Sequence, residues 1–278
     1  MRSLRNAFNL VSDPKLARDY LRFRLNKIRS NGEIIRQFPE DNLTIGGLSG
    51  FSEFHSCANF ISNAERKFLN RFSFADGPII DVGANLGIFS LLLARRFPDR
   101  IIYAFEPNPS TFEAMRANLS RNRCPKVQAH QKAIASSDGE ISFQANPVDR
   151  ATTHIVVGDS PIDHQEIPIV HVPSVTLDSF IESQPICEVA LLKVDVEGYE
   201  EIVFKGAERL LSTGIAKTIY YEVDPARTRK AGFDPAAASR RLLAHRYKLH
   251  TPDDSGRLRP VELSHIEHVT CENWVAIK

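Results

Sequence analysis

Cysteine is scarce in this 278-residue sequence, and the few copies are far apart. The four cysteines are Cys57, Cys124, Cys187 and Cys271, and no two of them form a Cys-x-x-Cys pair. That spacing excludes the usual zinc-binding and dithiol redox motifs. We interpret these residues as unpaired thiols of a protein kept in the reducing cytosol.

Long apolar runs and a charge imbalance are also missing. No stretch approaches the roughly 18 apolar residues that span a bilayer, and Arg2, Arg5 and Asn6 interrupt the first ten residues, unlike a secretory signal. The formal net charge of +1 gives no reason to expect nucleic acid as a partner. The sequence therefore predicts a cytoplasmic protein with no transmembrane segment and no nucleic-acid partner.

Positive charge is nevertheless concentrated near the start of the chain. Residues 1–37 hold nine Lys and Arg residues against three acids, and apolar residues at partly helical spacing predict a helix from Pro14 to Ser30. The charged face of this helix is either solvated or forms a weak peripheral contact with an anionic membrane surface or an acidic acceptor. Both interpretations stay open.

The most informative stretch runs from Pro78 to Pro109. An apolar run ends at Asp81, the turn Gly83-Ala84-Asn85-Leu86-Gly87 follows, a helical pattern comes next, and a second apolar run ends at Glu106. This order is typical of a nucleotide-binding half-unit, in which glycines let the backbone approach the ligand and the acid accepts from ribose hydroxyls. The Gly-x-x-x-Gly spacing differs from the dinucleotide pattern Gly-x-Gly-x-x-Gly and therefore argues against, without excluding, an NAD(P)-dependent oxidoreductase.

Acids end four apolar runs of the chain. Asp81, Glu106, Asp195 and Glu222 would lie along one edge of a parallel sheet, where their mutual repulsion requires a positive charge among them. A cationic ligand, a metal ion or Lys193 are the three candidates for that charge. The alternative is that Asp195 and Glu197 merely stabilise the start of the next helix.

The remaining pattern predicts further helices and strands. Helices are expected over 53–71, from Ser110 to about 122, and over 200–211, with Ser110 and Glu113 forming a capping box. Strands are expected over 127–134, 140–144 and 273–277, with a β-hairpin in place of a crossover helix after residue 134. The irregular stretch 146–170 is interpreted as an acceptor-binding loop or lid.

Six segments together resemble the FkbM-type methyltransferases, which are class I enzymes that use S-adenosylmethionine. They are DVGANLG at 81–87, AFEPNP at 104–109, the AI-turn-G segment at 133–139, VTLDSF at 175–180, LLKVDVEGYE at 191–200 and YEVD at 221–224. The resemblance covers about 78–224. It implies a doubly wound α/β fold with a mostly parallel, seven-stranded Rossmann-like sheet. We accordingly expect a basic, mainly helical N-terminal extension over 1–60 and an S-adenosylmethionine-binding domain over 61–278.

The resemblance also implies roles for residues of this chain. Asp81, Gly83, Ala84, Asn85 and Gly87 would shape the pocket for the methionine end of the cofactor. Glu106, followed by Pro107 and Asn108, would hold the ribose hydroxyls, and the backbone of Ala133 and Ile134 would border the adenine. The positively charged sulfonium of the cofactor would then balance the clustered carboxylates.

The implied reaction is transfer of a methyl group to a hydroxyl of a sugar, glycoconjugate or other natural product. Asp195 is the first candidate for the base that accepts the hydroxyl proton, followed by Glu222 and Glu197, with His154 as an outside candidate. Lys193 would offset charge or bind the acceptor, and Asp195 with Glu222 could instead hold a divalent metal such as magnesium. A non-catalytic protein that binds cofactor or glycan is the remaining alternative. Neither the acceptor nor the oligomeric state follows from the sequence.

Overall fold

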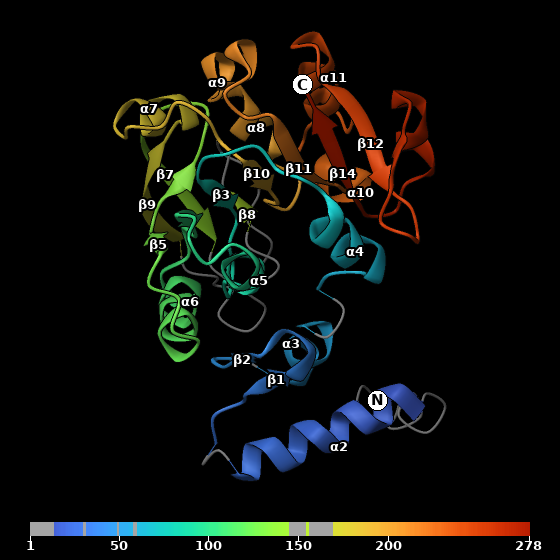
Figure 1. The fold of residues 1–278 in the computed structure, drawn as a ribbon. Helices are drawn as coiled ribbons and strands as arrows, with labels where there is room; N and C mark the ends of the chain where they lie inside the picture. The colour runs from blue at the N-terminus through green and yellow to red at the C-terminus, as the bar shows by residue number, and fades with distance from the viewer. Residues whose placement is uncertain (1–13, 30–31, 49, 58–59, 145–153, 156–168) are drawn as a thin grey trace.

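The computed structural model describes residues 14–29, 32–48, 50–57, 60–144, 154–155 and 169–278 (Figure 1). Of the stretch predicted to be an acceptor loop, 146–153 and 156–168 therefore lie outside the described residues. In the described part of the chain, no helix combines the length and the apolarity needed to cross a bilayer.

A large sheet of eight strands forms the centre of the described structure. Its order is β13-β12-β14-β11-β10-β3-β4-β5. The parallel strands are β3 (Ile79–Val82), β4 (Ile102–Phe105), β5 (Val127–His130), β10 (Leu191–Val194) and β11 (Thr218–Val223), and the antiparallel strands are β12 (Lys248–Pro252), β13 (Leu258–Pro260) and β14 (Glu272–Ile277). The mostly parallel, doubly wound fold is confirmed. The short edge strand β13 extends the seven expected strands to eight.

Helices cover both faces of this sheet, as Figure 1 shows. One face packs against α4 (Asn63–Arg71), α5 (Ile88–Arg96) and α6 (Pro109–Arg121), and the other against α7 (Leu177–Glu182), α8 (Glu200–Lys205), α9 (Glu208–Thr213) and α11 (Ala237–Ala244). Successive strand residues point to opposite faces, so Ile79 and Leu191 join the first core while Ile80 and Leu192 join the second. Burial on both sides explains why β3, β4 and β10 are almost entirely apolar in sequence.

A second, four-stranded sheet replaces part of the expected pattern. It contains β6 (Ala133–Ile134), β9 (Ile169–Val175), β7 (Gly139–Gln144) and β8 (His154–Ile155), in the order β6-β9-β7-β8. The predicted strand over 127–134 is confirmed as strand but is divided in two, because the chain leaves the large sheet after His130 of β5 and Ala133 of β6 pairs with Ser174 of β9. The predicted β-hairpin after residue 134 does not form, because β7 pairs antiparallel with β9 and β8 and not with the strand that precedes it.

Three predicted helix boundaries were wrong, two because of a capping side chain and one because of a distant backbone group. The helix over 53–71 is two helices, α3 (Phe51–Ser56) and α4, because Ser62 and Glu65 form a capping box that starts α4. Asn108 rather than Ser110 caps α6, with its Oδ1 accepting from Ser110 N at 3.0 Å. The helix over 200–211 divides into α8 and α9 at Gly206, where a Cβ would collide with the backbone carbonyl of Ala135.

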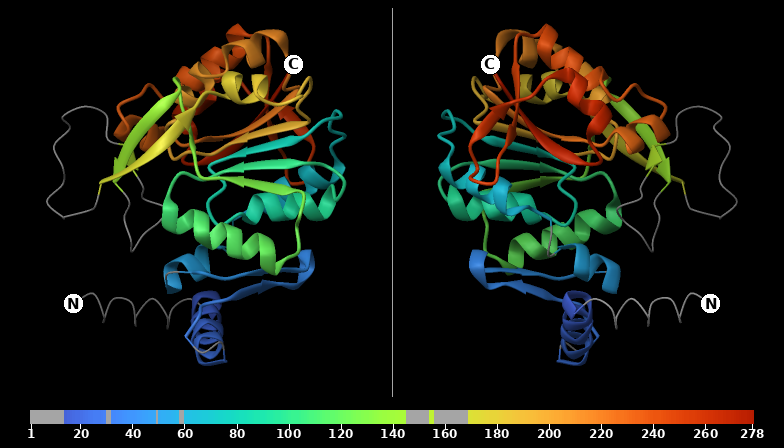
Figure 2. Two further views of the ribbon diagram at one scale, coloured as in Figure 1. Left: turned by 90° about the vertical axis from the view of Figure 1, so that its left-hand side faces the viewer. Right: turned by 90° about the vertical axis from the view of Figure 1, so that its right-hand side faces the viewer.

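The N-terminal segment packs beneath α6. It consists of α2 (Pro14–Arg29), β1 (Arg36–Phe38), a 3-10 turn (Pro39–Asp41), β2 (Leu43–Ile45) and α3. Asn122 Oδ1 accepts from Thr44 N at 2.9 Å and Asn118 Oδ1 from Gly46 N at 2.8 Å, which joins this segment to α6. Both views in Figure 2 place α2 at the far edge of the molecule, beyond the β1–β2 ribbon. The domain boundary at residue 60 stays a prediction.

Two shorter helical elements complete the described chain. The helix α10 (Pro225–Lys230) follows β11 and is capped by Asp224, whose Oδ1 accepts from Arg227 N at 2.9 Å. A 3-10 helix (Leu263–His268) lies between β13 and β14. The capping of α10 matters for the site because it positions Arg227 next to the end of β10.

Candidate active site

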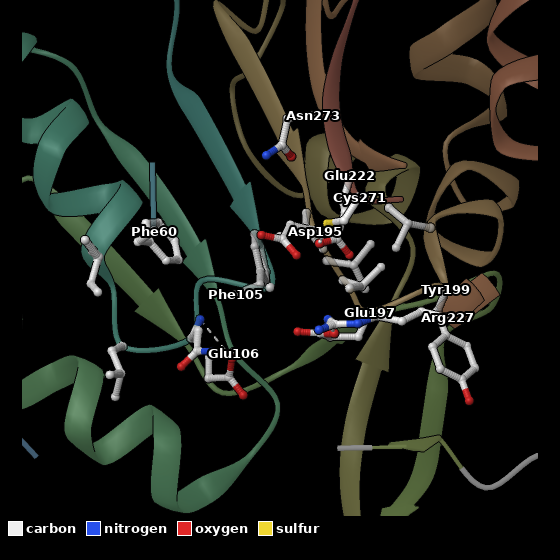
Figure 3. A pocket seen from close by; sticks show the side chains of 18 of the residues that line it. Phe60, Phe105, Glu106, Asp195, Glu197, Tyr199, Glu222, Arg227, Cys271 and Asn273 are labelled. Carbon is white, nitrogen blue, oxygen red and sulfur yellow. Dashed lines mark hydrogen bonds and ion pairs between the residues drawn. The ribbon is translucent and has the colours of Figure 1, made fainter. Parts of the chain in front are cut away.

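A cavity of about 720 Å³ opens at the carboxyl ends of the central parallel strands. This volume lies in the range of small-molecule sites. Its wall has three parts: strand ends of the large sheet, the neighbouring sheet, and segments from the two chain ends. The first part includes Gly83, Glu106, Asp195 and Glu222, the second Ala133, Ile134 and Ile141, and the third Glu53, Cys57, Phe60, Glu65, Cys271 and Asn273. In Figure 3, Glu106 and Phe60 lie on one side and Asp195, Glu222 and Cys271 on the other.

Glu106 is held at the edge of the cavity by backbone groups. Its Oε2 accepts from Asn85 N at 3.0 Å and its Oε1 from Asn108 N at 2.9 Å. Burial raises the pKa of Glu106 to about 7, although the two backbone N–H groups and Lys193 oppose that shift. Because each carboxylate oxygen can accept more than one hydrogen bond, both oxygens keep capacity for hydroxyl groups of a ligand.

The glycine turn after β3 is required by the packing of the chain. Gly83 and Gly87 have positive φ angles of 76° and 80°. A Cβ on Gly83 would collide with the carbonyl oxygen of Asp195, and one on Gly87 would come within 2.9 Å of Met115 Cγ. Packing against the rest of the protein is therefore one reason for glycine at these two positions, and the expectation that glycine also lets the backbone approach a ligand stays a prediction. Between them, Asn85 has φ 50° and lines the cavity.

Lys193 lies beneath the cavity, between two of the predicted acids. Its side chain is 2 % exposed, and its Nζ lies 3.2 Å from Asp81 Oδ1, 3.3 Å from Asp195 Oδ2 and 3.1 Å from the Gly83 carbonyl, to which it donates. Burial lowers the pKa of Lys193, but the carboxylates of Asp195 and Asp81 outweigh it and raise the pKa above its ordinary value. Of the three candidates for the positive charge, Lys193 is therefore in place. Its burial leaves it no access to an acceptor.

Asp81 is completely buried in the same cluster. Besides facing Lys193, its Oδ2 accepts from Ser90 Oγ at 2.6 Å, which ties the end of β3 to α5. Both Asp81 and Lys193 are described residues, and neither lines the cavity. Asp195 does line it, with its side chain 26 % exposed. The structure therefore separates a buried acid and its lysine from the acid that a ligand could reach.

Glu197 is occupied by an ion pair. Its Oε2 contacts Arg227, whose Nε also lies 3.2 Å from Asp224 Oδ2. Glu197 has a positive φ of 58°, and Gly198 follows at 95°. The carboxylate of Glu200, rather than that of Glu197, accepts from backbone groups here, namely Val196 N and Gly198 N. An ion-paired Glu197 is a weaker candidate for a base than the sequence suggested.

Glu222 faces the cavity from the end of β11. Burial, followed by the nearby Asp195 and Glu200 carboxylates, raises the pKa of Glu222 to about 9. Cys271 Sγ donates to its Oε1 at 3.4 Å, and its Oε2 has no hydrogen-bond partner among the described residues. Partial burial, followed by the Glu222 carboxylate, raises the pKa of the Cys271 thiol to about 12. Glu222 is therefore protonated near neutral pH when the cavity holds no ligand.

Sequence reasoning missed a polar group on the third part of the wall. Glu65 Oε1 accepts from Asn273 Nδ2 at 2.7 Å and from the Tyr220 hydroxyl, and Glu65 Oε2 accepts from Ser62 N at 2.7 Å. Asn273 Oδ1 is buried without a hydrogen-bond partner among the described residues. The Ser62-x-x-Glu65 capping box was visible in the sequence, but nothing there indicated that Glu65 would meet Asn273.

The other predicted site residues divide into three groups. Ala133, Ile134, Phe105 and Pro107 line the cavity, and the contact of the first two with the adenine stays a prediction. Ala84 is buried, and Asn108 acts as the helix cap described above. His154 is in β8, and its backbone pairs with that of Gln144 in β7. The side chain of His154 lies outside the described part of the structure.

The predicted metal site gains no support. Within the described ranges, no three His, Cys, Asp or Glu side chains are grouped so that they could hold a metal ion. Asp195, one of the two proposed ligands, already faces Lys193. We therefore assign no metal to this cavity.

Comparison with known proteins identifies the family. A sequence profile of the methyltransferase FkbM domain matches residues 81–249, which is more than half of the chain. The chain belongs to the FkbM methyltransferase family. The resemblance seen in the sequence is thereby confirmed.

Individual relatives are more distant. The chain is 33 % identical over 147 residues to Methyltransferase 1 of Beauveria bassiana, covering 48 % of this chain and 59 % of the relative. It is 30 % identical over 152 residues to the hexuronic acid methyltransferase AglP of Haloferax volcanii, covering 54 % of this chain and 59 % of that protein. The alignments thus span about 59 % of the length of these relatives. The chain also resembles a crystal structure of an FkbM methyltransferase from Methylobacillus flagellatus, with 14 % identity and a TM-score of 0.47. The superposition includes 75 % of this chain and 45 % of that one.

The cavity fits the cofactor that this family implies, S-adenosylmethionine. Four buried polar atoms on its wall have no hydrogen-bond partner among the described residues: Asn85 Oδ1, Thr111 Oγ1, Glu222 Oε2 and Asn273 Oδ1. Buried polar atoms are rarely left unpaired, so these atoms point to polar ligands. Gly83, Asn85, Glu106 and Glu222 lie inside the range matched by the FkbM profile, whereas Phe60, Glu65, Cys271 and Asn273 lie outside it.

Proposed function

We propose that this protein is an S-adenosylmethionine-dependent O-methyltransferase whose acceptor is a hydroxyl, in the first place of a sugar or glycoconjugate. The observation that carries the proposal is the arrangement of the cavity, with Glu106 on one side and Asp195 and Glu222 on the other (Figure 3). When bound, the cofactor supplies an electrophilic methyl group on a positively charged sulfur.

Glu106 is the proposed ribose-binding residue. Its oxygens are already oriented by Asn85 N and Asn108 N, so a ligand does not have to order them. Pre-organised acceptors of this kind lower the cost of binding. Ala133, Ile134 and Phe105 supply an apolar surface next to Glu106 that suits a planar base.

Asp195 is the proposed proton acceptor. It is partly exposed in the cavity, whereas Asp81 is buried and Glu197 is paired with Arg227. Lys193 lies 3.3 Å from Asp195 Oδ2 and orients that carboxylate from below. A neutral hydroxyl is a poor nucleophile, and a positioned carboxylate accelerates such proton transfers by about 10²–10⁴-fold.

The sugar acceptor is supported by the wall that lies outside the family-matched range. Phe60 offers an aromatic face, and Glu65 with Asn273 offers polar atoms that suit the hydroxyls of a sugar. One relative of the chain is named as a hexuronic acid methyltransferase. A small natural-product hydroxyl is the alternative acceptor, because the same polar atoms would accommodate it.

The decisive test is ligand stabilisation followed by product mass. A thermal shift by S-adenosylhomocysteine, without a shift by NADH or NADPH, is expected because only a ligand that binds the folded state raises its melting temperature. Stabilisation by NADH or NADPH instead would favour the oxidoreductase alternative. A mass gain of one methyl group on a uronic acid or other glycan acceptor, unaffected by a chelator, is then expected. A protein that binds the cofactor but methylates none of a broad acceptor panel would favour a non-catalytic role.

We also propose a cytoplasmic location. All four cysteines are free in the structure, and Cys187 and Cys271 are exposed. Exposed free thiols are typical of proteins kept in a reducing compartment. Fractionation of cells that express the full protein, with markers for each compartment, checks this assignment.

A further inference from the structure

The outer face of α2 carries an apolar stripe that the described structure leaves uncovered. Leu21, Leu25 and Ile28 are 63 %, 52 % and 74 % exposed. At 100° per residue they lie within about 60° of one another around the helix axis. The other large apolar side chains that are exposed in the described part, Ile101, Ile169 and Leu243, lie on separate elements. We name the set of Leu21, Leu25 and Ile28 the outer stripe.

The opposite face of the same helix is already used for packing. Phe23 is buried, with its ring 5.5 Å from that of Phe51 and 5.7 Å from that of Phe54. Asp19 is also buried, with Oδ1 3.4 Å from Arg36 Nη2 and Oδ2 3.0 Å from His55 Nδ1. Because the inner face holds α2 on the protein, the outer stripe has no part in folding this segment.

Basic side chains flank the outer stripe on both sides. Arg18 and Arg22 lie on one flank and Arg24 lies on the other, with Lys27 further round the helix on the side of Arg24, and all four are exposed. The helix has six basic residues and one acid, Asp19, which is turned into the core. Since the whole chain has a net charge of only +1, this positive charge is local to α2.

We propose that the outer face of α2 docks on an anionic lipid bilayer, lying flat in its headgroup region. An apolar stripe bordered by Lys and Arg is the pattern of helices that bind membrane surfaces, because the apolar side chains enter the acyl boundary while the cations meet lipid phosphates. Charge complementarity identifies the occupant, since each Lys or Arg near an anionic leaflet adds attraction. The position of α2 at the edge of the molecule leaves its outer face accessible to a flat surface (Figures 1 and 2).

The test is co-flotation of the full chain with lipid vesicles at low salt. We expect binding to phosphatidylcholine vesicles that contain phosphatidylserine, at least about tenfold weaker binding to phosphatidylcholine alone, and release of the protein at about 0.5 M NaCl. Failure to bind the anionic vesicles, or equal binding to both kinds, would overturn the proposal.

Two sets of variants separate the stripe from its charges. Leu21→Gln/Leu25→Gln/Ile28→Gln should lower vesicle binding by more than tenfold, and Arg24→Gln/Lys27→Gln should lower it by about tenfold. The matched controls are Leu243→Gln, for an exposed leucine on α11, and Lys217→Gln/Arg257→Gln, for an exposed Lys and Arg outside α2, and both should bind like the wild type. Unchanged binding in the stripe variant would contradict the proposal.

Stability and association are measured on the same samples. The substituted side chains are exposed, so the melting temperature and its shift by S-adenosylhomocysteine should stay at wild-type values. These readouts are independent of lipid binding, and a negative flotation result therefore leaves the proposed enzyme activity intact. If analytical ultracentrifugation shows a wild-type dimer that the stripe variant abolishes, a second copy covers α2 and the membrane proposal is wrong.

Discussion

The two sides of the cavity hold their carboxylates in different ways. Near β4, both oxygens of Glu106 accept backbone N–H groups, from Asn85 and Asn108. Near β10 and β11, the acids face side chains: Lys193 for Asp195, and the Cys271 thiol for Glu222. The first arrangement needs only the fold, whereas the second depends on the identity of several residues.

The two arrangements differ in how easily a single substitution changes them. Backbone amides stay in place whatever side chains surround them, so the Glu106 side suits a ligand that does not change. The opposite wall includes Cys271 and Asn273, which lie outside the matched range 81–249. Side-chain contacts can be replaced one at a time, so we assign the acceptor to this second side.

The largest effect is expected from Asp195→Asn, which tests the second side alone. The amide cannot accept the hydroxyl proton, so kcat should fall by about 10²–10⁴-fold. The affinity for S-adenosylhomocysteine, measured by calorimetry, should stay within about threefold. Asp254→Asn, an exposed acid on the loop between β12 and β13, is the control and should behave like the wild type. If turnover and cofactor affinity fell by the same factor, Asp195 would be a cofactor-binding residue. The cofactor would then contact both sides of the cavity.

Glu106→Gln tests the first side. Two charge-assisted hydrogen bonds to ribose hydroxyls would be lost or weakened, so the affinity for S-adenosylhomocysteine should fall by about 100-fold. Glu113→Gln on α6, whose side chain is 66 % exposed, is the control with the same chemical change. The affinity is measured by calorimetry on both variants. Wild-type affinity in the Glu106 variant would refute the assignment of ribose to this residue.

Asn273→Ala tests whether the wall outside the family range contacts the acceptor. Removal of its Oδ1 takes away a buried acceptor atom that faces the cavity, so KM for the hydroxyl substrate should rise by about tenfold. The cofactor affinity should not change, because Asn273 lies on the far side from Glu106 (Figure 3). Steady-state kinetics with each substrate varied in turn provide both numbers. A rise in KM for the cofactor alone would place the acceptor elsewhere.

The smallest effect is a pH-dependent gain in stability from Glu222→Gln. The pKa of Glu222 is about 9 in the folded protein against an ordinary 4.5. The unfolded chain therefore releases a proton between these pH values, and the wild type loses stability as the pH rises from about 4.5 to 9. Glutamine cannot ionise, so the cofactor-free variant should be more stable than the wild type at pH 8, by about 1–3 kcal/mol, and nearly equal to it at pH 4.5.

Thermal melts of both proteins from pH 4.5 to 9 measure this difference. Glu106 also has a raised pKa of about 7, but Glu222 is not among the groups that shift it, so its contribution is equal in both proteins and cancels. Glu113→Gln, the same chemical change at an exposed position, again serves as the control. A gap between the Glu222 variant and the wild type that stayed constant across the pH range would mean that Glu222 is ionised in the folded cavity.

Much of the Glu106 side was predictable from the sequence. The apolar runs that became β3 and β4, the glycine turn and the acid at residue 106 are local patterns, and the sheet placed them as expected. A second reason for the glycines was not predictable from the sequence, because Asp195 and Met115 come close to Gly83 and Gly87 only in the folded chain. Helix ends were misplaced where a cap or a distant backbone group decided them, as at Ser62 and Gly206.

The sequence by itself determined which apolar runs form strands. It also showed that an acid stands at the end of each of four of these runs. Only the tertiary structure decided what those acids meet. Lys193 lies between Asp81 and Asp195 because β10 pairs with β3 in that register, and Glu65 meets Asn273 across 208 residues of sequence. Periodicity reports the environment of an element along its own length, whereas charge pairing depends on which elements the fold brings side by side.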